Sequence, residues 1–169
     1  MMGWVAILMG SEGDWPTMQG AADTLAALGV HCEVRITSAH RTPRATAEYV
    51  ADAESRGCQA FICGAGMAAH LAGAVAALTI KPVIGVPIDS GPLAGFDALL
   101  STVQMPGGIP VATVAVGKAG AKNAAYLASE ILALNDPTLA ARVKADREAN
   151  AAKVGEQNAR LAQQRSQKS

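Results

Sequence analysis

Short apolar segments alternate along the chain with segments of helical periodicity, and this alternation constrains the fold more than any other feature. Each apolar run ends in a turn rich in glycine or polar residues. Strands separated by helices pair in parallel through right-handed crossovers. We therefore predict an α/β fold, a three-layer α/β/α sandwich around a five-stranded parallel sheet. The predicted strands are 4–9, 31–36, 60–63, 82–88 and 111–116, and the helical segments between and after them are 16–28, 45–56, 68–78, 97–103 and 119–134.

The last part of the chain differs from the rest. Residues 1–134 are predicted to form the catalytic domain, and residues 135–169 a helical extension of it that begins near Pro137. This helix is charged and has only a thin apolar stripe, so it can bury little against its own body. We predict that it packs on a neighbouring subunit and frays after about Gln163. Its periodic apolar residues are Leu139, Val143 and Val154.

Composition narrows the classes of partner. Fourteen basic and fourteen acidic residues give a formal net charge of zero, and without a basic stripe neither nucleic acid nor an anionic membrane is expected as a partner. Glycine and proline interrupt the apolar runs before they reach membrane-spanning length, and no charged flank with a cleavage site opens the chain. Cys32, Cys58 and Cys63 lack a paired metal-ligand spacing, so they are predicted to be inert thiols of a cytoplasmic protein.

The turn after the second predicted strand, Ile-Thr-Ser-Ala-His-Arg-Thr-Pro, carries the most chemistry. His40 supplies an imidazole, Arg41 is a permanent cation, and Ser38 and Thr42 supply hydroxyls, a combination suited to binding anions and moving protons. Pro43 suits the first turn of a helix, which places the group at the ligand edge of an α/β sheet. The alternative is an ordinary helix entry with Ser38 near the cap and Arg41 solvated.

The turn after the first predicted strand brings glycines to a helix start. Gly10 and Gly13 allow a tight turn that exposes backbone N–H groups to an anion. Asp14 is negative, so it suits a ribose hydroxyl, while Ser11, the amides and Arg41 would serve a phosphate. The alternative makes Asp14 the N-cap of the following helix.

The third turn, residues 64–69, matches the G-x-G-x-x-A pattern of dinucleotide-binding folds, and Asp89 follows at about the expected distance. The pattern lies on the third strand rather than the first, however, and leaves the two earlier turns unexplained, so dinucleotide binding is disfavoured. His70 follows directly. It is either a core histidine on an alanine-rich helix or a second imidazole facing the same crevice as His40.

Together these residues resemble a known family. The chain is similar to the bacterial N5-carboxyaminoimidazole ribonucleotide mutases of purine biosynthesis over about residues 4–134, whereas its last helix matches only loosely. The motifs that carry the resemblance are Gly10-Ser11-x-x-Asp14-Trp15, Ser38-Ala39-His40-Arg41-Thr42-Pro43, Gly64-Ala65-Gly66-x-Ala68-Ala69-His70-Leu71, Gly85-Val86-Pro87 and Leu100-Ser101-x-Val103-Gln104-Met105-Pro106-x-Gly108-x-Pro110-Val111.

The resemblance implies a flavodoxin-like subunit of a homo-octamer, active sites where subunits meet, and no metal, nucleotide or biotin cofactor. The substrate would be a small phosphorylated ribonucleotide whose carboxylate moves from the exocyclic nitrogen to carbon 4 of the imidazole ring. His40 would be the acid and base, and His70 would line the carboxylate pocket. The substrate-binding residues implied are Ser11, Asp14, Ser38, Arg41, Gly66 and His70.

Three positions depart from the family pattern. Gly13 stands where the family usually has serine, Met67 replaces a common glycine, and Ala72 a common proline. The last two are expected around the carbon dioxide pocket. Two alternatives to the mutase stay open, namely direct carboxylation of aminoimidazole ribonucleotide by dissolved carbon dioxide, and a non-catalytic nucleotide-binding module of flavodoxin-like fold.

Overall fold

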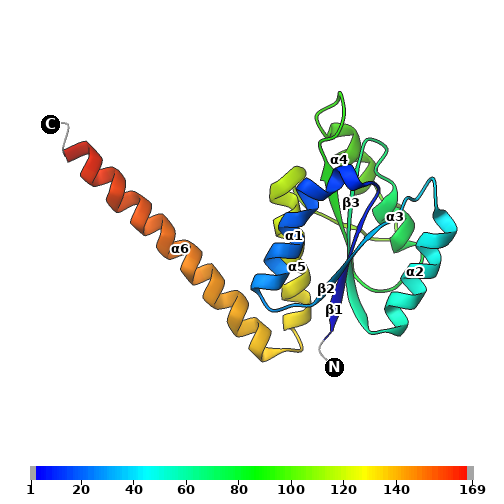
Figure 1. The fold of residues 1–169 in the computed structure, drawn as a ribbon, viewed down its shortest axis with the longest axis horizontal. Helices are drawn as coiled ribbons and strands as arrows, with labels where there is room; N and C mark the ends of the chain where they lie inside the picture. Colours follow the sequence, from blue (N-terminus) through cyan, green and yellow to red (C-terminus); the bar gives the residue numbers. More distant parts are fainter. Residues whose placement is uncertain (1–2, 167–169) are drawn as a thin grey trace.

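The computed structural model describes residues 3–166, and within this range the chain forms a five-stranded parallel sheet in the order β2-β1-β3-β4-β5. Helices cover both faces of the sheet (Figure 1), which confirms the predicted α/β/α sandwich. The strands are β1 (Trp4–Met9), β2 (Cys32–Ile36), β3 (Cys58–Gly66), β4 (Val83–Ile88) and β5 (Ala112–Thr113). The helices are the short 3-10 helix η1 (Glu12–Asp14), α1 (Trp15–Ala27), α2 (Pro43–Ser55), α3 (Leu71–Ala76), α4 (Phe96–Val103), α5 (Gly117–Ala133) and α6 (Pro137–Ser166).

The core forms two layers, one on each face of the sheet. Every residue of β1 is buried, and successive side chains point to opposite faces. Val5 and Ile7 pack in the layer under α1 and α5, whereas Ala6 and Leu8 pack in the layer under α2 and α3. A central parallel strand is therefore apolar throughout, which is why its bounds could be predicted without error.

The bounds of some strands and helices differ from the prediction, mainly where strand pairing extends or shortens a segment beyond what its residues favour. The strand predicted at 60–63 extends as β3 from Cys58 to Gly66. It is longer because β3 pairs with β1 as far as Gly64 and with β4 as far as Gly66, so the pairing continues through both glycines. The strand predicted at 111–116 shrinks to β5, an edge strand paired only at Ile84 and Gly85 of β4. The helix predicted at 68–78 begins only at Leu71.

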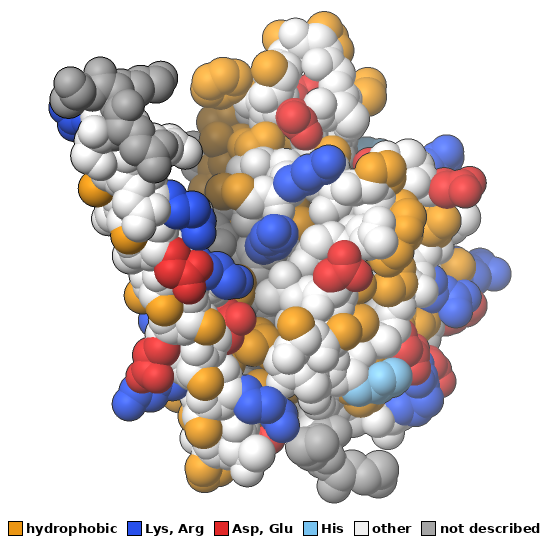
Figure 2. Space-filling model, turned by 60° about the vertical axis from the view of Figure 1, so that its left-hand side comes forward, with side chains coloured by type: hydrophobic (Ala, Val, Ile, Leu, Met, Phe, Trp, Pro, Cys, Tyr) orange, Lys and Arg blue, Asp and Glu red, His pale blue; other side chains and the backbone are white. Residues whose placement is uncertain are grey.

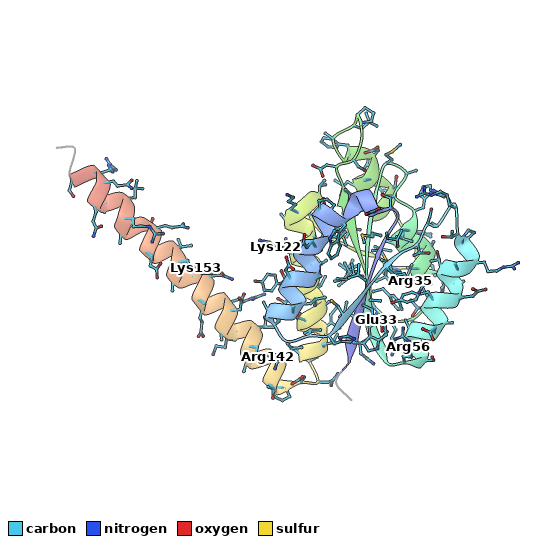
Figure 3. All side chains as sticks on the ribbon, viewed as in Figure 1. Glu33, Arg35, Arg56, Lys122, Arg142 and Lys153 are labelled. Atoms are coloured by element: carbon cyan, nitrogen blue, oxygen red, sulfur yellow. The ribbon has the colours of Figure 1, made fainter. Side chains whose placement is uncertain are left out.

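The sheet edge formed by β2 is charged on one side. Glu33 accepts a bidentate hydrogen bond from Arg56 and a further bond from the Tyr49 hydroxyl, and Arg35 lies over the Tyr49 ring. Figure 3 shows Glu33, Arg35 and Arg56 together between β2 and α2. The bond from Arg56 lowers the pKa of Glu33, while burial raises the pKa of Tyr49. Charged groups of this kind protect an edge strand against pairing with another chain.

Helix α6 leaves the body of the molecule (Figure 1). Asp136 Oδ1 caps its first turn by accepting bonds from the amides of Thr138 and Leu139, at 2.9 and 3.0 Å. The Tyr126 hydroxyl of α5 donates to Asp146 at 2.7 Å, and from residue 147 onward every described residue of α6 is exposed. In Figure 2 the distal part of α6 stands off the body as a separate column bearing both signs of charge.

The end of α6 differs from the prediction. The helix continues through Ser166, so the fraying predicted after Gln163 is wrong for residues 164–166, and residues 167–169 lie outside the described part of the chain. Helix α6 has 30 residues, yet no helix within residues 3–166 combines the length and apolar character that crossing a membrane requires.

Candidate active site

The turns that follow β1, β2 and β3 meet at the carboxyl edge of the sheet around a pocket of about 370 Å³. All seven residues predicted for the site contribute to its wall, although they come from three separate connections. They are Ser11, Asp14, Ser38, His40, Arg41, Gly66 and His70. Two wider hollows of about 860 and 1000 Å³ adjoin the amino ends of β4 and of β1 and β3. Neither contains a pair of imidazoles, and ligands of open α/β sheets bind at the carboxyl edge.

Two histidines face each other in this pocket. His40 lies in the turn between β2 and α2, and His70 occupies the N-cap position of α3, 30 residues further along the chain. His40 Nε2 lies 2.8 Å from His70 Nδ1, and the rings meet edge to face at an interplanar angle of 87°. One nitrogen must donate and the other accept, so the two imidazoles share a proton. Both side chains are exposed and line the pocket, so of the two alternatives for His70 the structure has the one that faces the same crevice as His40, not a core position.

A buried pair of threonine hydroxyls supports the turn that carries His40. Thr37 and Thr46 are 5% and 2% exposed, and their Oγ1 atoms lie 2.6 Å apart. The Thr46 hydroxyl also donates to the Thr42 carbonyl at 3.1 Å, which leaves Thr37 to donate to Thr46. The Thr42 hydroxyl in turn accepts the Ser38 amide at 3.0 Å. The sequence analysis missed Thr37 and Thr46, whose signal was a concentration of hydroxyl side chains around one turn.

Replacing Thr46 with valine should therefore destabilise the protein by about 1–3 kcal/mol, because it leaves the buried Thr37 hydroxyl and the Thr42 carbonyl without this partner. The variant keeps the side-chain volume but removes the hydroxyl. Urea denaturation measures the loss, and Thr46→Ser, which keeps the hydroxyl, should retain most of the stability. A Thr46→Val variant as stable as the parent would contradict this role.

The first turn is organised by hydrogen bonds between two residues predicted for the site. Asp14 is 7% exposed, and its Oδ2 accepts bonds from the amide and the hydroxyl of Ser11, at 3.0 and 3.2 Å. Asp14 occupies the N-cap position of α1, as the alternative predicted, but its side chain makes no bond to α1 and instead completes the capping box of η1 with Ser11. Gly13 does not line the pocket, and a Cβ added there would meet only Ser11 Oγ, at an ordinary 3.5 Å.

Arg41 joins the first turn to the second. Its Nη2 donates to the carbonyl of Gly10 at 2.8 Å, and its Nε lies 3.5 Å from Ser38 Oγ, which also accepts the Arg41 amide at 3.1 Å. The side chain is exposed, yet it is held in place, so the interpretation of Arg41 as a merely solvated residue is wrong. A guanidinium carries five N–H groups, and this one retains donors for an anionic ligand.

The glycines of the third turn serve close packing. A Cβ on Gly66 would lie 1.8 Å from Ser90 Oγ, and a Cβ on Gly64 would lie 2.4 Å from Met18 Sδ. The two glycines are therefore explained by the close approach of Ser90 and Met18, without a bound dinucleotide. Ser90, in the loop that follows β4, also lines the pocket.

Like Gly13, a second departure from the family pattern does not line the pocket. Ala72 is 2% exposed and packs in the core beside Gly85, so its predicted place in the pocket wall is wrong. The thiols of Cys58 and Cys63 are buried, and burial raises the pKa of both, as expected for inert cysteines. Within residues 3–166, no three His, Cys, Asp or Glu side chains gather in a way that could hold a metal ion.

The fold and the pocket define an α/β protein of the doubly wound type, with a pocket at the carboxyl edge of its sheet in which two histidines face each other. The family model described as AIR carboxylase matches residues 4–153. The chain belongs to the AIR carboxylase family.

Relatives extend over nearly the whole chain. The N5-carboxyaminoimidazole ribonucleotide mutase of Brucella melitensis is 55% identical over 152 residues, which cover 90% of this chain and 94% of the relative. The mutase of the same name from Escherichia coli is 52% identical over 150 residues, 89% of each chain. The crystal structure of Treponema denticola PurE superposes with a TM-score of 0.85 at 34% identity, covering 94% of this chain and 98% of that one.

Proposed function

We propose that this chain is an isomerase of purine biosynthesis that converts N5-carboxyaminoimidazole ribonucleotide to 4-carboxy-5-aminoimidazole ribonucleotide. The observation that carries the proposal is the contact between His40 Nε2 and His70 Nδ1, at 2.8 Å, within a pocket built from three strand-end turns. The mutases of Brucella melitensis and Escherichia coli, which share about half of the aligned residues, support it.

In the first step His40 acts as the acid. A carbamate releases carbon dioxide readily once its nitrogen is protonated, so the enzyme needs a nearby proton donor more than a strong electrophile. His40 as imidazolium protonates the exocyclic nitrogen, and the electrons of the breaking carbon–nitrogen bond stay with the nitrogen. Neutral carbon dioxide then lies beside the electron-rich ring carbon.

In the second step carbon 4 attacks carbon dioxide, and a carbon–carbon bond forms. His40, now neutral, removes the proton from carbon 4 and returns to its starting state. One imidazole can serve both half-reactions because the proton that it gives up is recovered. His70, which lines the carboxylate pocket, holds the shared proton of the imidazole pair in the hydrogen bond between the two rings.

The remaining predicted residues bind the ribonucleotide. Ser11, the amides of the first turn and Arg41 face the phosphate, and Asp14 accepts a ribose hydroxyl. Ser38 and Gly66 complete the wall. In support, the bond from Arg41 to the carbonyl of Gly10 places a cation beside the start of α1, where backbone N–H groups and a positive helix end favour an anion.

We further propose a cytoplasmic homo-octamer in which α6 extends the catalytic domain and packs on a neighbouring subunit. The exposed length of α6 beyond residue 147 supports such packing. Large apolar side chains exposed on α4 support a subunit boundary near the site, and they are Phe96, Leu100 and Val103. Free buried thiols fit a reducing compartment. Light scattering of the purified protein tests the assembly, and a monomer mass at micromolar concentration would contradict it.

Two assays separate the mutase from its alternatives. We expect conversion of N5-carboxyaminoimidazole ribonucleotide without added bicarbonate, and little product from aminoimidazole ribonucleotide with bicarbonate. The opposite pattern would identify a direct carboxylase. Binding of the ribonucleotide without any product would identify a non-catalytic module.

A further inference from the structure

Met67 adopts a backbone conformation that a methionine rarely occupies. Its φ is +55°, in the left-handed region that favours glycine, and its side chain is 58% exposed. Residues in strained backbone conformations cluster at functional sites, so a strained Met67 beside the pocket points to a role for its side chain.

The Met67 side chain lies between the pocket and the loop that follows β4, residues 89–95. Met67 lines the same pocket as His40 and His70. On its other side, a Cβ built on Gly91 would lie 3.3 Å from Met67 Cγ, and the adjacent Ser90 packs directly over Gly66. The third turn and the loop between β4 and α4, residues 89–95, therefore approach each other at two successive positions, and Met67 supplies the apolar side chain that covers the second.

We infer that Met67 is the cover that retains carbon dioxide between the two half-reactions. The inference rests on the proposed function and adds to it a role for this chain's own side chain. Carbon dioxide has no net charge and offers little to bind by hydrogen bonds, so only contact with surrounding walls can keep it near carbon 4. A thioether side chain is apolar and adapts its shape to an irregular gap. Leu71, which also lines the pocket, is buried, so it cannot close the mouth.

Three variants separate the cover from the strained backbone. Met67→Ala removes the cover but keeps the side-chain Cβ, and hence the strain, at positive φ. Met67→Gly removes both. Met67→Leu keeps an apolar cover of similar volume and the strain. Each variant, as the full-length protein, is given unlabelled N5-carboxyaminoimidazole ribonucleotide in buffer with ¹³C-bicarbonate and carbonic anhydrase, and initial product is analysed by mass spectrometry.

We expect the parent and Met67→Leu to form product that is almost free of label. Met67→Ala and Met67→Gly should incorporate several-fold more label and release more free carbon dioxide for each turnover. In thermal unfolding Met67→Gly alone should gain stability, by about 2–4 °C in Tm, because it relieves the left-handed backbone. Met67→Gly would then retain carbon dioxide less well than the parent and yet have a higher Tm.

The outcomes distinguish the inference from the proposed function. If the parent converts the ribonucleotide with its own carboxylate but Met67→Ala and Met67→Gly exclude label equally well, Met67 is not the cover. If Met67→Leu leaks as much as Met67→Ala, retention does not depend on an apolar side chain there, which also overturns the inference. If the parent forms no product, the proposed function itself fails.

Discussion

Replacing His40 with asparagine is expected to lower kcat by roughly 10²–10⁴-fold, the contribution of a positioned acid and base, while the dissociation constant of the ribonucleotide changes only a few-fold. Asparagine can still form a hydrogen bond toward His70 Nδ1, which lies 2.8 Å from His40 Nε2, but it cannot exchange a proton near neutral pH. Single-turnover kinetics with calorimetric binding measures both quantities.

His31 offers a matched control. It is the other histidine within residues 3–166, it precedes β2, and it lies outside the pocket at the opposite edge of the sheet. His31→Asn should therefore leave kcat near that of the parent. A His40→Asn variant with parental kcat would remove His40 from the chemistry. A His40→Asn variant that no longer binds the ribonucleotide would give His40 a binding role in its place.

Replacing Arg41 with methionine is expected to lower kcat/KM by roughly 10–100-fold, since hydrogen bonds to a charged group are worth about 1.5–3 kcal/mol. The guanidinium would contact the substrate phosphate, and it also bonds to the carbonyl of Gly10 and so ties the first turn to the second. The loss should appear mainly in KM, because the phosphate is remote from the reacting carbon. Steady-state kinetics separates the two parameters.

Two further variants test the geometry at Arg41. Arg41→Lys keeps the charge but cannot reproduce the planar fork of donors, so it should recover only part of the lost affinity. Arg44→Met removes a neighbouring exposed cation that does not line the pocket and should have little effect. Equal losses in Arg41→Met and Arg44→Met would indicate general electrostatic attraction and would contradict a specific phosphate contact.

The order of strands and helices could be predicted because the core strands are continuous apolar runs. In β1 both faces are buried, so its bounds match the prediction at each end. At the edge of the sheet the same signal misleads. Val34 and Ile36 on β2 are 41% and 52% exposed, although an apolar strand predicts burial. The periodicity of a strand shows which of its side chains share a face, but not whether another element covers that face.

The members of the site could also be predicted, since the carboxyl ends of parallel strands meet at one edge. What the sequence could not provide was the pairing of side chains distant along the chain. The contact between His40 and His70 spans 30 residues, and the bond from Arg41 to Gly10 spans 31. The bond between Thr37 and Thr46 could not be predicted for a different reason, because hydroxyl residues around a turn are usually exposed and only the burial of these two shows their supporting role.

The most direct test is a crystal structure of the His40→Asn assembly with N5-carboxyaminoimidazole ribonucleotide bound. We expect the imidazole ring of the substrate in the pocket of the three turns, with its carbon 4 about 3–3.5 Å from the substituted side chain at position 40, which marks the place of proton transfer. The phosphate should contact Arg41 and the amides near Ser11, both of which line that pocket. A ribonucleotide bound at the amino edge of the sheet, or with carbon 4 turned away from position 40, would contradict the assignment.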